Sequence, residues 1–261
     1  MKSKMSDEHL NELMYAKELL ENPGLAARLS DFIGKPVEGD LEMVPEKYQG
    51  VIKDATKKSL EKALDFAVMT MGSGEEGESH DMFHKICATG VGVLGGVFGM
   101  RALLIELPVT TVIMLRSIAD IARSEGEDIE DIEAKLASLE VLALGGTSKD
   151  DDAAETDYYG VRAFLGREVS NAAKYIAEKG FAEEGAPVLV RLIAKISSRF
   201  GIVVSEKVAA GAVPVVGAIG GGAVNLVFID HFQKMARGHF IVRRLEKEYG
   251  EELVKSEYER I

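Results

Sequence analysis

The chain has 261 residues, of which 46% are apolar, and its 31 basic and 43 acidic residues give a net charge of −12. This length allows a substantial hydrophobic core, in one large domain or two small ones. The acidic excess argues against nucleic-acid binding, which needs clustered Lys and Arg, and against electrostatic docking on anionic lipid.

The first residues predict a helical lead-in. Residues 6–32 have the spacing of an amphipathic helix that Ser6 caps and that Asn22-Pro23-Gly24 interrupts. We therefore assign residues 1–44 to this lead-in. A long helix is expected to begin at Pro45, because the first position of a helix tolerates proline, and to end at Met71.

Two uncharged runs are rich in glycine. Residues 86–100 and 208–229 contain five glycines each. In the first run, Gly92 and Gly96 are four residues apart, as are Gly95 and Gly99. Small residues at this spacing let helix backbones approach closely, so we expect two central helical hairpins. The second run is long enough to span a membrane, but its glycines, Pro214 and Asn225 disfavour its transfer into lipid. The alternatives are a hairpin that enters a membrane only on demand and a stable membrane span.

Between and after these runs, apolar periodicity continues to predict helices. Pro108 should kink or restart the helix that follows the first run. Asp128 is expected to cap the next helix, which runs to about Leu144 and which Gly145-Gly146 end. The acidic loop 145–157 is the candidate boundary between two halves. Further helices are expected over residues 158–179, from Pro187, and over residues 230–249.

No segment alternates apolar and polar residues in the manner of a β-strand, so we expect an all-α fold. Residues 45–261 would form one multi-helix domain. The Val-Val pairs at 203–204 and 215–216 are the places where a strand could contradict this expectation. Each half contains a glycine-rich run followed by an amphipathic helix, which leaves open a degenerate internal repeat of two related halves.

Two segments resemble a known family. Residues 107–128 contain a Leu-Pro followed by hydroxyl residues and an Arg-Ser-Ile-Ala helix, and residues 213–250 contain a Gly-Gly-Ala helix with Asn225. Together they resemble the EcsC protein family of bacteria, with a likeness that extends over residues 47–250. That family takes its name from a protein encoded beside an ABC exporter and is often described as membrane-associated. The resemblance implies a peripheral membrane or transport-accessory role and no established reaction, cofactor or catalytic residue.

Three residues form a candidate metal site. His80 and His84 are four residues apart, and on a helix Cys87 shares their face. Imidazole and thiolate are good zinc ligands, and the spacing is that of metalloproteases with Asp81 in place of the Glu base. A zinc-dependent hydrolase is therefore an alternative function. We favour a structural role for these side chains, with no cofactor, because Cys87 opens an apolar run.

Four polar residues on apolar helices form a candidate ligand pocket: Thr111, Arg116, Asn225 and His239. Arg116 has the spacing to pair with Asp120, and the hydroxyl groups after Pro108 have the spacing to bond carbonyls that proline leaves unpaired. Burial of such groups is costly unless each finds a partner. The alternative to a pocket is therefore that the four residues satisfy one another between the two halves.

We expect a non-enzymatic EcsC-like protein that binds an apolar ligand, a lipid or a membrane partner, and no nucleic acid. A purely structural interaction module is a further alternative. The first fourteen residues contain no apolar stretch typical of a secretory signal, and the single cysteine cannot form an internal disulfide. These features predict a cytoplasmic protein, and the family resemblance implies a peripheral position at the inner face of the membrane.

Overall fold

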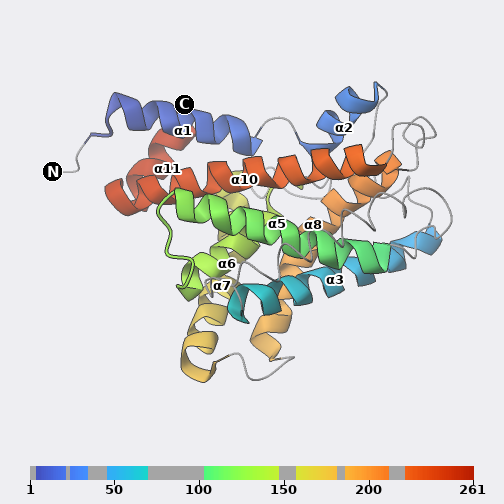
Figure 1. Cartoon of the computed structure of the whole chain (residues 1–261). Coiled ribbons are helices and arrows are strands. Elements are labelled where there is room, and N and C mark those ends of the chain that lie inside the picture. Colours follow the sequence, from blue (N-terminus) through green and yellow to red (C-terminus); the bar gives the residue numbers. More distant parts are fainter. Residues whose placement is uncertain are drawn as a thin grey trace.

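The structure is a computed structural model that describes residues 4–21, 24–34, 46–69, 103–146, 157–180, 186–211 and 221–261. Every regular element within these ranges is a helix (Figure 1). This confirms the all-α multi-helix fold. Of the two glycine-rich runs, only the ends of the second, in helices α8 and α10, lie within the described residues. The two predicted hairpins therefore remain predictions.

The N-terminal helices are α1 (Asp7–Glu21) and α2 (Leu25–Ile33). The Ser6 hydroxyl accepts a hydrogen bond from the His9 backbone N–H at 3.1 Å, which confirms the expected cap. Helix α1 lies along the C-terminal helix α10 (Gly221–Tyr249), as Figure 1 shows. The contact requires a glycine at position 238, where a Cβ atom would lie 2.9 Å from the Ala16 carbonyl oxygen.

Helices α3 (Glu46–Met69) and α5 (Leu103–Ser124) pack against each other. The predicted restart at Pro108 is wrong, because a single helix, α5, continues through this residue. The predicted kink stays a prediction. Pro108 lies near the start of the helix and is buried among apolar side chains. Its missing N–H removes one backbone hydrogen bond, and the packing of the long apolar face offsets that loss.

Helix α6 (Ile132–Glu140) is capped by Asp131, so the prediction of Asp128 as the cap is wrong. Asp128 instead accepts a hydrogen bond from the backbone two residues later, which shapes the turn before the helix. A short 3-10 helix, η3 (Val141–Ala143), follows α6. Gly145 then adopts a positive φ of 76°, in agreement with the predicted end of this helical segment.

The second half contains α7 (Tyr158–Lys179), α8 (Pro187–Gly211), α10 and α11 (Glu251–Arg260). The bounds of α7 and the start of α8 are as predicted. Residues 203–204 lie in α8 and form no strand, whereas residues 215–216 lie outside the described ranges. Helix α10 begins at Gly221 rather than at position 230, because its buried apolar stripe extends back through Phe228 to Val224.

Helix α10 is the centre of the bundle. It contacts α1, α2, α5, α8 and α11. Three of its phenylalanines are fully buried, and Phe232 packs edge to face against Phe200 of α8, with ring centroids 5.6 Å apart. Side chains along α10 therefore take part in several of the helix–helix interfaces of the fold.

Candidate functional site

The two glycine-rich runs connect to the same end of the bundle. The first run precedes α5 in the sequence, and the second links α8 to α10. Figure 1 shows the start of α5, the end of α8 and the start of α10 close together. We call this region, residues 103–106, 205–211 and 221–226, the glycine-run end.

A buried polar cluster joins the three helices at the glycine-run end. The Lys207 ammonium of α8 lies 3.2 Å from Oε1 of Glu106 on α5. Asn225 of α10 donates a hydrogen bond from Nδ2 to the same oxygen, at 3.0 Å. The cluster therefore fixes the positions of three helix ends relative to one another.

Both charged groups of this cluster are withdrawn from water. Their side chains are only 4% (Lys207) and 9% (Glu106) exposed. Burial lowers the pKa of the Lys207 ammonium, and the Glu106 carboxylate opposes that shift. The ammonium also lies 4.8 Å from the centre of the Phe228 ring, a cation–π contact. Glu106 Oε2 and Asn225 Oδ1 are buried without a hydrogen-bond partner in the described part of the chain.

Large apolar side chains point outward beside this cluster. Ile105 is 74% exposed and Leu226 is 70% exposed. Each follows or precedes a member of the cluster in the sequence, and neighbouring helical residues point about 100° apart. The same turns that turn Glu106 and Asn225 inward therefore expose an isoleucine and a leucine at the end that the glycine-rich runs adjoin.

The four predicted ligand residues do not share one pocket. Asn225 belongs to the glycine-run end, whereas His239 lies about 21 Å further along α10, at a rise of about 1.5 Å per residue. His239 Nδ1 lies 2.9 Å from the Tyr158 hydroxyl of α7. The Thr111 hydroxyl is buried and donates to the Leu107 carbonyl of its own helix at 2.8 Å.

Arg116 is partly buried on α5 and does not pair with Asp120 as predicted. Arg123 takes that role and donates to Asp120 at 3.0 Å. The surroundings of Arg116 are separate from those of Asn225 and His239. Asn225 bonds to Glu106, and His239 bonds to Tyr158. The four polar residues therefore do not form hydrogen bonds with one another.

The candidate metal residues His80, His84 and Cys87 lie outside the described residues. The zinc site therefore remains a prediction from sequence. Within the ranges that the structure describes, no group of three or more His, Cys, Asp or Glu residues could hold a metal ion.

One buried histidine was not singled out as a site residue. His231 is fully buried, and neither ring nitrogen has a hydrogen-bond partner among the described residues. Burial lowers its pKa to about 3, so the ring is neutral at ordinary pH. A Cβ atom at Gly145 would lie 2.6 Å from Cε1 of this ring, which requires glycine there. The sequence signal was weak, because His231 neighbours an aspartate that suggests an exposed position.

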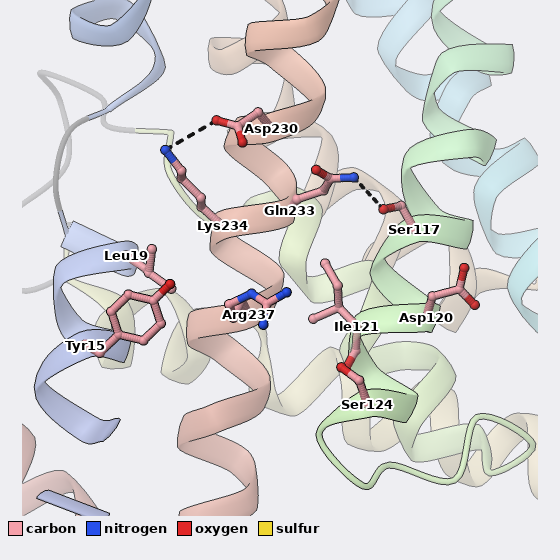
Figure 2. A pocket seen from close by; sticks show the side chains of 10 residues that line it. All are labelled: Tyr15, Leu19, Ser117, Asp120, Ile121, Ser124, Asp230, Gln233, Lys234 and Arg237. Carbon is pink, nitrogen blue, oxygen red and sulfur yellow. Dashed lines mark hydrogen bonds and ion pairs between the residues drawn. The ribbon is translucent and has the colours of Figure 1, made fainter. Parts of the chain in front are cut away.

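A groove of about 440 Å³ runs between α1 and α5, with α10 as its floor (Figure 2). Its lining residues on α5 and on α10 are spaced i, i+3, i+4, i+7, so one face of each helix contributes. The lining residues are Tyr15 and Leu19 of α1, Ser117, Asp120, Ile121 and Ser124 of α5, and Asp230, Gln233, Lys234 and Arg237 of α10. The sequence could not reveal this groove, because α1 and α10 are distant in the chain.

The fold and the two sites define an all-helical bundle with a buried ionic cluster at one end and a lateral groove. The chain belongs to the EcsC protein family, whose match covers residues 7–245 and so includes α1, α2 and most of α10. No curated protein and no solved structure gave a match. Among the described helices, none combines the length and the apolar character that crossing a membrane requires.

Proposed function

We propose that this EcsC family protein is a non-enzymatic peripheral membrane protein that binds lipid through its glycine-run end. The exposure of Ile105 and Leu226 at that end is the observation that carries the proposal. The membrane-linked biology that the family resemblance implies agrees with it.

Burial in lipid would remove both side chains from water. Complete burial of one such side chain stabilises by about 1.5–3 kcal/mol, so two of them give a modest, reversible attachment. The uncharged glycine-rich runs adjoin the same end in sequence and would add apolar surface. With a net charge of −12, the protein has no general electrostatic attraction to anionic lipid, so apolar contact must supply the binding free energy.

Vesicle flotation with substituted proteins tests this proposal. The test variant carries Ile105→Asp and Leu226→Asp, two exposed positions at the glycine-run end. The control is Val190→Asp, because Val190 is 45% exposed and lies about 25 Å from Lys207 along α8. We expect the double variant to lose flotation on uncharged vesicles by about tenfold or more, while the control floats like the parent. Equal flotation of all three proteins would overturn the proposal.

A further inference from the structure

The polar side chains of the lateral groove are mostly engaged within the protein. Gln233 donates to the Ser117 hydroxyl at 2.7 Å. The Lys234 ammonium lies 3.3 Å from the Asp230 carboxylate, which also binds Arg28 of α2. These contacts give each of these polar side chains at least one partner along the upper part of the groove in Figure 2.

The two carboxylates of the groove are neutralised by cations. Asp230 has two cationic partners, and Asp120 has Arg123. The Ser124 hydroxyl donates to the Ile121 carbonyl at 2.7 Å and is therefore also engaged. The groove consequently presents less negative charge than its composition suggests.

Arg237 is the exception among the charged residues that line the groove. It is exposed and forms no hydrogen bond or ion pair with the part of the chain that the structure describes. The other two arginines of α10, Arg243 and Arg244, each pair with carboxylates. In a protein with 43 acidic and 31 basic residues, an arginine that faces a groove without an acidic partner stands out.

We propose that the groove binds a small molecule with a carboxylate or phosphate group attached to an apolar or aromatic portion. The planar guanidinium of Arg237 matches the two oxygens of such an anion. Figure 2 shows Arg237 between Tyr15 of α1 and Ile121 of α5, which would contact the apolar portion together with Leu19. The ammonium of Lys234 has three donors and lies one turn away on the same helix face, so it can add a second hydrogen bond.

The groove is separate from the membrane contact proposed above. Arg237 lies about 16 Å from Leu226 along α10. Interfacial helices sink only about 5–10 Å into the lipid boundary. If Leu226 contacts the membrane, Arg237 therefore lies beyond that depth, and a dissolved ligand is favoured over a lipid headgroup. The inference does not depend on the proposed membrane function.

Calorimetric titration of the full chain tests the groove, with inorganic phosphate and phenyl phosphate as probes. We expect phenyl phosphate to bind more tightly than inorganic phosphate. Arg237→Gln should weaken both by about tenfold or more, and Tyr15→Ala should remove only the advantage of phenyl phosphate. The matched control is Arg191→Gln, which removes the same charge from an exposed position of α8 outside the groove and should change neither affinity.

Three outcomes would overturn the inference. One is the absence of saturable binding by either probe. Another is equal weakening in the Arg237→Gln and Arg191→Gln variants, which would indicate unspecific attraction to positive charge. The third is a loss of binding to phosphatidic acid vesicles in Arg237→Gln with phenyl phosphate affinity unchanged, which would assign this arginine to lipid headgroups. Arg237→Lys retains the charge without the planar fork, so a partial loss of affinity would support the proposal if Arg237→Gln does not fold.

Discussion

The Lys207 ammonium and the Glu106 carboxylate form a buried ion pair, 3.2 Å apart, between residues that are distant in the sequence. Asn225 donates to the same carboxylate oxygen. A buried ion pair gains little net stability over an apolar pair of similar size, but removal of one partner is costly. The pair therefore specifies how the ends of α5, α8 and α10 meet.

Lys207→Met should destabilise the protein by about 3–5 kcal/mol, because Glu106 would remain buried without its cation. The double substitution Lys207→Met and Glu106→Leu should recover part of this loss, because it removes the unpaired carboxylate but also the acceptor of the Asn225 amide. Urea unfolding of the parent, the single variant and the double variant measures the free energies. A single variant as stable as the parent would show that the pair is not closed in solution.

His231→Leu should leave the unfolding free energy unchanged or raise it by about 1 kcal/mol. Both ring nitrogens of His231 are buried without partners among the described residues, so an apolar side chain of similar size removes a desolvation cost. The matched substitution, His239→Leu, should cost about 1–3 kcal/mol because the buried Tyr158 hydroxyl loses its partner. Thermal or urea unfolding measures the stability of both variants. Equal losses of unfolding free energy in the two variants would contradict the different surroundings of the two histidines.

Gly145→Ala should destabilise the protein by several kcal/mol, on the order of the cost of core overpacking plus backbone strain. The new methyl group would overlap the His231 ring, and φ at this position is 76°. In the background of His231→Ala the overlap with the ring disappears. The strain of the positive φ, about 1 kcal/mol, then remains, together with a close approach of 3.2 Å to Sδ of the flexible Met235 side chain. A double-mutant cycle measured by urea unfolding tests this, and additive losses would contradict the contact.

Glu206→Gln should stabilise the protein more at pH 8 than at pH 5. Burial raises the pKa of Glu206 to about 7, although the backbone N–H of Ala26 on α2 opposes the shift. A raised pKa means that the folded state holds the proton more tightly, so this contribution to stability is full below pH 4.5 and is lost as the pH rises through 7. The difference in unfolding free energy between variant and parent should grow by roughly 3 kcal/mol over that range. A difference that does not change with pH would contradict this environment for Glu206.

Local signals predicted the helices well, whereas contacts between distant residues could not be predicted. The apolar period and the caps gave α7 and the start of α8, because both signals depend only on near neighbours. They misplaced the cap of α6 because Asp128 and Asp131 are both suitable cap residues, and only the backbone conformation selects between them. The predicted restart at Pro108 failed for a different reason, because the packing of the long apolar face of α5 outweighs the one backbone hydrogen bond that proline removes.

The candidate site was predicted only in part. Asn225 was selected as a polar residue on an apolar stripe, which is what the structure contains, but the pairing with Glu106 joins residues more than one hundred positions apart. Lys207 escaped notice because it borders an apolar run and looks like the end of a charged segment. The groove depends on α1 lying along α10, an arrangement that no local pattern encodes.

Flotation of the parent protein on uncharged vesicles, in low and in high salt, tests the central claim most directly. Exposed Ile105 and Leu226 predict binding that persists at high salt, because ions screen charge interactions and leave apolar contact intact. The Ile105→Asp and Leu226→Asp double variant should remain in the vesicle-free fraction at both salt concentrations. Failure of the parent to float, or flotation that disappears at high salt, would contradict lipid binding through the glycine-run end.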